Sequence, residues 1–79
     1  MKQEMARIDA ERVERQRERL HVEEQLFKYQ GALEMARHVG AQEKVPELEG
    51  AIGQLLVQRD QVGQRLAELD AQFLSLIHI

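Results

Sequence analysis

Cysteine is absent from this 79-residue chain, and aromatic residues are few. Without cysteine the chain has no disulfide framework and no thiol chemistry, and it suits a reducing compartment. Phe27, Tyr29 and Phe73 are its only Phe, Tyr or Trp residues, too few for the core of a globular α/β domain. Glu, Gln, Arg, Leu and Ala dominate instead, which is the composition of long helices.

Long apolar runs and an excess of positive charge are also missing. No stretch approaches the roughly 20 apolar residues that a membrane-spanning helix needs. Residues 1–8 are followed by dense charge and not by the apolar run of a signal peptide. The 11 Lys and Arg residues are outnumbered by 14 Asp and Glu residues, for a net charge of −3. We therefore expect a cytoplasmic protein with no membrane span, and we do not expect nucleic acid as its main partner.

Groups typical of catalytic and metal sites are sparse and scattered. Ser75 is the only Ser or Thr residue, and the three histidines do not cluster. Glu18 and His21 have the Glu-x-x-His spacing of di-metal helix bundles, but one copy on a charged helix face is typical of a solvated surface. We therefore predict no enzyme activity, no catalytic residue, no metal, no cofactor and no small-molecule substrate.

Two helices separated by one break are predicted. Residues 2–39 contain no proline and mostly good helix formers. Acidic and basic residues four apart support this helix, namely Glu11–Arg15 and Glu24–Lys28. Gly40 can end it in a left-handed conformation, and Pro46 fits the first position of a second helix. We predict a single domain over residues 1–79, with helices over about 2–39 and 46–77 and a turn over 40–46.

Three glycines fall within the second predicted helix, at positions 50, 53 and 63. Each weakens a helix by about 1 kcal/mol relative to alanine. They indicate either that a neighbouring backbone comes close to this helix or that they occupy tolerated surface positions.

Apolar residues at alternating four- and three-residue steps run along both predicted helices. This period of 3.5 residues is typical of a coiled-coil seam. If the chain folds back near residues 42–43, the two stripes pair in rungs from Ala36–Leu48 to Val22–Val62. The predicted fold is therefore all-α, an antiparallel two-helix hairpin that is coiled-coil-like. Its interaction stripe comprises Val22, Leu26, Tyr29, Leu33, Leu48, Ile52, Leu55, Val62, Leu66, Leu69 and Phe73.

Arginines occupy several positions of this stripe. Leu26 faces Arg59, whose guanidinium could be taken by Glu23. Nearer the chain ends, three arginines face three apolar residues, namely Arg19 with Leu66, Arg15 with Leu69 and Arg12 with Phe73. In the interpretation that we favour, the arginine stems cover the apolar side chains while their heads reach water. In the alternative, this half of the stripe is left for another chain.

A second apolar line lies beside the stripe. Val13, Leu20 and Phe27 are seven residues apart, and Leu56 flanks the stripe on the second helix. A two-helix hairpin cannot bury both lines well. We therefore predict that the chain self-associates into a helical bundle or docks on a larger protein partner.

The last six residues, from Leu74 to Ile79, raise a separate question. They resemble the conceptual translation of a transposase mosaic-end adaptor used in sequencing libraries. The resemblance implies that the chain is a fragment translated from an assembled environmental read, and that the native sequence departs near Leu74. The same residues also fit the final apolar turn of the second helix.

Three hypotheses for function follow. The favoured one is a non-catalytic coiled-coil interaction or structural module that works through its apolar heptad stripes, as a homo-oligomer or with a protein partner. The second is a truncated helical arm of a larger protein, such as an enzyme or a nucleic-acid-associated machine. The weakest is RNA or DNA binding through residues 12–19, because acidic residues interleave with the arginines there and neutralise their field.

Overall fold

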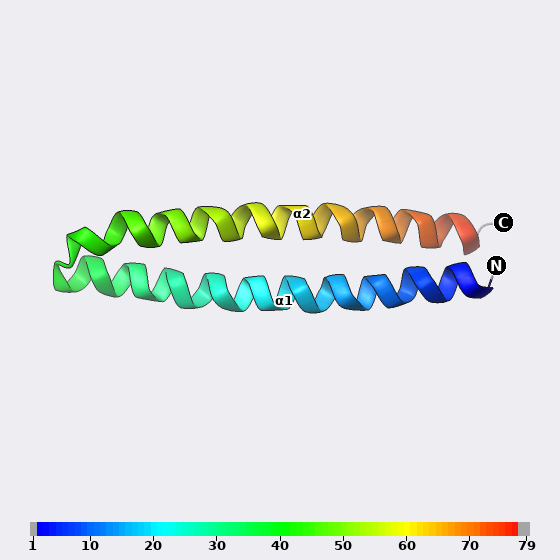
Figure 1. The fold of residues 1–79 in the computed structure, drawn as a ribbon, viewed down its shortest axis with the longest axis horizontal. Helices are drawn as coiled ribbons and strands as arrows, with labels where there is room; N and C mark the ends of the chain where they lie inside the picture. Colours follow the sequence, from blue (N-terminus) through cyan, green and yellow to red (C-terminus); the bar gives the residue numbers. More distant parts are fainter. Residues whose placement is uncertain (1, 78–79) are drawn as a thin grey trace.

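The chain folds as an all-α helical hairpin, as predicted. A computed structural model describes residues 2–77, in which helix α1 (Lys2–Val39) is followed by the short 3-10 helix η1 (Gln42–Lys44) and by helix α2 (Val45–Ile77). The two long helices lie side by side and run in opposite directions (Figure 1). Residues 1, 78 and 79 belong to the predicted domain but lie outside the described residues.

The molecule is a thin rod. Its extents are 59 × 14 × 14 Å, and its radius of gyration is 17.7 Å, against about 12 Å for a globular domain of this length. A helix of 38 residues is about 57 Å long, so the length of α1 sets the length of the rod. The start of α1 and the end of α2 lie at the same end of the rod, and the turn lies at the other (Figure 1).

Backbone hydrogen bonds and one glycine form the turn. Gly40 has a φ of +78°, the left-handed conformation that glycine adopts most readily. The Ala41 N–H then donates to the Ala36 carbonyl at 2.8 Å, which is the six-to-one bond of a Schellman helix end. The Lys44 N–H donates to the Ala41 carbonyl at 3.1 Å and closes η1. Pro46 lies in the first turn of α2, where its missing N–H costs no hydrogen bond.

The core is a single stripe between the two helices. Seven side chains are buried, namely Ile8, Val22, Leu26, Ala36, Val62, Leu66 and Leu69. Leu69 is the most enclosed, with 1% of its surface exposed. No described side chain that is buried is polar or charged. The hairpin is therefore held by one narrow apolar contact, and most polar groups remain at its surface.

Of the glycines of α2, Gly50 and Gly53 are exposed and Gly63 is half-buried. A Cβ atom placed on Gly50, Gly53 or Gly63 would meet nothing within 4 Å. Close approach of another backbone therefore does not explain them, and the alternative of tolerated surface positions agrees with the structure. Across residues 2–77, neither long helix has a segment apolar enough to cross a membrane.

Candidate interaction surface

The predicted interaction stripe lies between the two helices, at graded depths. Its buried members are Val22, Leu26, Val62, Leu66 and Leu69. Its half-buried members are Leu33, Leu48, Ile52, Leu55 and Phe73. Tyr29 lies at the edge, with 36% of its surface exposed. Ile8, which continues the four-three spacing of the first helix before the stripe, is buried as well.

The part of the stripe in which arginines face apolar residues is covered within the single chain. The guanidinium of Arg12 lies over the Phe73 ring, 4.9 Å from its centroid, and its Nε is 2.9 Å from Asp70 Oδ1. Leu66 and Leu69 are buried in the single chain. The expectation that this half is left open for another chain is therefore wrong for these two leucines. The favoured interpretation fits in part, because arginine stems pack on apolar surface and the side chains of Arg12 and Arg15 are 27% and 34% exposed, but the Nε atoms of both are buried and do not reach water.

Neighbouring acids hold the other arginines of this segment. Arg15 Nη1 lies 2.7 Å from Glu18 Oε2, and Arg19 Nε lies 3.9 Å from Glu23 Oε1. Together with Arg12, three of the arginines in residues 12–19 thus have an acidic partner in the chain. Arg17 is the exception among the described residues, so this segment does not present a continuous basic surface.

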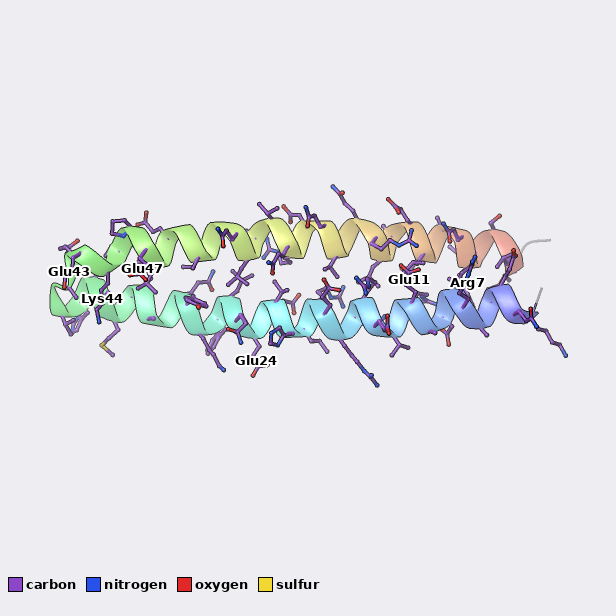
Figure 2. The ribbon with its side chains drawn as sticks, in the orientation of Figure 1. Arg7, Glu11, Glu24, Glu43, Lys44 and Glu47 are labelled. Carbon is purple, nitrogen blue, oxygen red and sulfur yellow. The ribbon has the colours of Figure 1, made fainter. Side chains whose placement is uncertain are left out.

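One ion pair crosses the helices with two hydrogen bonds. Arg65 of α2 donates from Nε to Glu11 Oε2 at 2.6 Å and from Nη2 to Glu11 Oε1 at 2.9 Å. Figure 2 shows Glu11 pointing toward α2. The hydrogen bonds from Arg65 hold the pKa of Glu11 below its ordinary value, and the bonds to Glu11 and Glu68 raise the pKa of Arg65. Such a bidentate pair fixes geometry as well as adding attraction.

The sequence did not predict this pair, although a signal for it was present. Glu11 and Arg65 each precede a stripe residue by one position, where interhelical ion pairs form in coiled coils. The expected local pair of Glu11 with Arg15 is replaced by the pair with Arg65. A second cross-helix pair joins Arg37 Nη2 to Glu49 Oε1 at 3.0 Å, near the turn.

Two other expected pairs are not formed. Glu24 and Lys28 make no ion pair in the described part of the chain, although their spacing suits one. Arg59 lies beside Asp60, with Nε 4.0 Å from Oδ1, and is not held by Glu23, because Glu23 contacts Arg19. Long charged side chains have several oppositely charged residues within reach, and the separation along the sequence does not determine which one they contact.

The second apolar line remains uncovered on α1. Val13, Leu20 and Phe27 are 42%, 61% and 80% exposed, and we call these three residues the outer row. Each follows a stripe position by one residue, which turns it about 100° around the helix and away from α2. Leu56, expected on the same face, is half-buried on the other helix. The outer row therefore consists of α1 residues alone.

A shallow apolar groove lies beside the turn. Its volume is about 350 Å³, and its lining comprises Ala32, Met35, Ala36, Val39, Ala41, Lys44 and Leu48. Met35 and Val39 are largely exposed. Ala36 and Leu48 form a predicted rung, whereas the exposed Met35 and Val39 fall outside the four-three pattern and were not singled out from the sequence.

The candidate chemical groups remain apart. Glu18 contacts Arg15, while His21 is exposed. Ser75 lies in a groove with Glu4, Arg7, Ile8, Gln72 and Leu76, and no histidine within residues 2–77 lines this groove. Among residues 2–77, no three His, Asp or Glu side chains are grouped so that they could hold a metal ion.

The structure describes only the first part of the adaptor-like segment, residues 74–77. α2 continues to Ile77, with Leu76 half-buried and Leu74 and Ile77 exposed. His78 and Ile79, which belong to the adaptor-like segment, lie outside the described residues. The adaptor origin of residues 74–79 stays a prediction. Comparison with families, curated proteins and solved structures finds nothing that matches this chain.

Proposed function

We propose that this chain is a non-catalytic interaction module that self-associates through apolar side chains on the outside of the hairpin. The observation that carries the proposal is the outer row, in which Val13, Leu20 and Phe27 are aligned on α1 and exposed. Single exposed apolar residues are ordinary on protein surfaces, whereas an apolar row at seven-residue spacing along one helix face is a surface on which another helix can pack. The heptad stripe forms the hairpin itself, so the outer row is an apolar surface that remains for a partner along the length of α1.

Stability gives a second reason to expect association. The two helices share one narrow core stripe, and small domains with little buried surface are commonly completed by oligomerisation. The absence of cysteine is compatible with a cytoplasmic setting. The ion pairs of Arg12, Arg15 and Arg19 within the chain weaken the case for nucleic acid as partner.

Sedimentation of the purified chain over a range of concentrations tests this proposal. We expect concentration-dependent association, which is lost when Leu20 and Phe27 are both replaced by Gln. The control replaces Leu74 and Ile77 by Gln, because these apolar residues are also exposed but lie on α2, and association should persist. A monomer with full, cooperative helicity at every concentration would contradict the proposal.

A second candidate is a helical arm of a larger protein. The observation in its favour is that the start of α1 and the end of α2 lie at one end of a 59 Å rod, so that the turn forms a distant tip (Figure 1). The groove beside the turn would then be the contact at that tip. The source DNA beyond the codon for Phe73 separates the candidates, because a stop codon soon after it favours the module and a long continuation favours the arm.

A further inference from the structure

Two charged residues without partners alternate with the outer row. Arg17 lies four residues after Val13, and Glu24 lies four residues after Leu20, so each is a neighbour on the same helix face. Both are exposed, and neither makes an ion pair with another described residue. Figure 2 shows Glu24 pointing away from α2. This face of α1 therefore combines uncovered apolar side chains with one free charge of each sign.

We infer that a second copy of this chain covers the face, with α1 packed antiparallel on α1 and Leu20 at the two-fold axis. The inference rests on the proposed self-association through the outer row and adds the direction and register of the contact. Leu20 then meets Leu20 of the second copy, and Val13 meets Phe27 of the second copy. Such a contact is isologous, because both copies use the same patch.

The charges select the antiparallel direction. In the inferred arrangement Arg17 lies opposite Glu24 of the second copy, and the two-fold axis repeats this pair on the other side of Leu20. In a parallel arrangement Arg17 would face Arg17 and Glu24 would face Glu24. Like charges in contact across an interface are unfavourable and exclude an arrangement more strongly than opposite charges reward one.

The same two residues select the register. If one helix slides by seven residues in one direction, Arg17 comes to face Arg17 of the second copy. If it slides by seven residues in the other direction, Glu24 comes to face Glu24 of the second copy. Only the register centred on Leu20 keeps opposite charges together while the apolar side chains stay aligned.

The residues beside the inferred α1–α1 contact and at its ends also suit this arrangement. Glu14 lies opposite Lys28 of the second copy in this register, and Lys28 has no ion-pair partner among the residues described. At the ends of the contact Ala10 meets Gly31 of the second copy, so two small residues allow the helices to approach. The contact spans about 32 Å of α1.

This arrangement places α2 on the outside of the dimer. The outer row faces away from the stripe that holds α2, so both hairpins keep their own cores when the α1 helices meet. The dimer is then a layer of four helices with the two α1 helices in the centre.

Single cysteines test the direction of packing, because the chain contains no other cysteine. Under oxidised glutathione, Leu20→Cys should cross-link to itself as a disulfide dimer. Val13→Cys should not cross-link to itself, because its counterpart in the second copy is Phe27. A mixture of Val13→Cys and Phe27→Cys chains should cross-link to each other. The matched control is Val57→Cys, an exposed position on α2 that should stay reduced.

The outcomes separate this inference from the proposed function. If Val13→Cys cross-links to itself and no disulfide joins a Val13→Cys chain to a Phe27→Cys chain in the mixture, the packing is parallel and the inference is overturned. A dimer that is lost when Leu20 and Phe27 are replaced by Gln, but that forms no Leu20→Cys cross-link, would show association through the outer row in another register or direction, so that the proposed function stands and the inference fails. A monomer in sedimentation would overturn both.

Charge reversal tests the register independently. Arg17→Glu and Glu24→Arg should each weaken dimerisation about tenfold, because each places like charges opposite each other at two symmetric sites. The double variant restores opposite charges and should return the dissociation constant to within about threefold of the original. Circular dichroism should show unchanged helicity in all three chains. If the double variant is weaker than both single variants, the inferred register is wrong.

Discussion

Arg65 of α2 holds Glu11 of α1 through two nearly parallel hydrogen bonds of 2.6 and 2.9 Å. These residues are 54 positions apart in the sequence, so the pair ties the two helices together far from the turn. It lies beside the stripe segment in which Arg12 and Arg15 face apolar residues. A specific ion pair therefore joins the two helices in the region where arginines interrupt the apolar stripe.

Replacing Glu11 by Gln should lower the melting temperature at neutral pH. Because Arg65 holds the pKa of Glu11 below the ordinary value of 4.5, the pair stabilises the fold fully above that value and progressively less as the pH falls through the lowered pKa. Thermal unfolding at about pH 7 and about pH 3 should therefore show a difference between the two chains that shrinks in acid. Glu34→Gln is the control, because Glu34 is exposed, and it should change little at either pH.

Replacing Arg15 by Leu should stabilise the hairpin by about 1 kcal/mol. Arg15 faces the core stripe, and its Nε is buried without a hydrogen-bond partner among the described residues. A leucine would remove this cost and add apolar contact with the other helix. Arg59→Leu should stabilise less, because Arg59 occupies a stripe position but is exposed. Urea unfolding of the three chains measures the effect, and a loss of stability in Arg15→Leu would contradict this account.

Replacing Leu69 by Ala should destabilise the hairpin by about 2–4 kcal/mol. Leu69 is the most enclosed side chain, with 1% exposure, so truncation loses apolar burial and leaves a cavity. A narrow core gives a small free energy of unfolding, so we expect the helical content of Leu69→Ala to fall at room temperature. Val57→Ala is the control on the same helix, because Val57 is 56% exposed. Circular dichroism against temperature should show unfolding at lower temperature for Leu69→Ala only.

Two glycine replacements should act in opposite directions. Gly40→Ala should destabilise by about 1 kcal/mol, because Gly40 has a φ of +78° that a Cβ atom opposes. Gly53→Ala should stabilise by about 0.5–1 kcal/mol, because Gly53 is helical and a Cβ there meets nothing within 4 Å. Chemical unfolding of both chains measures the two changes. Equal effects of the same sign would show that the turn does not depend on its left-handed residue.

The hairpin itself could be predicted from the sequence because its signals are local or periodic. The four-three spacing marks one face of each helix, and Gly40 and Pro46 supply a helix end and a helix start. The structure places Arg12 over Phe73 and lines one groove with Ala36 and Leu48, and both of these pairs are rungs of the predicted pairing.

The ion pairs could not be predicted in the same way. Glu11 has Arg15 within reach along its own helix and Arg65 across the helices, and each geometry is plausible from spacing. The structure chooses Arg65, because helix packing brings its guanidinium to both oxygens of one carboxylate. Glu24 and Lys28 have a suitable spacing and still do not pair, since exposed pairs gain little over hydration.

The sequence by itself determined that this protein is two long helices folded back on one another, because helix propensity, helix ends and apolar period are properties of neighbouring residues. Only the tertiary structure decided which apolar residues stay exposed. Leu66 and Leu69 face positions occupied by arginines and are nevertheless buried, whereas Val13, Leu20 and Phe27 are uncovered. The physical reason is that arginine stems can complete an apolar contact, while a two-helix rod has one inner face and cannot cover a second.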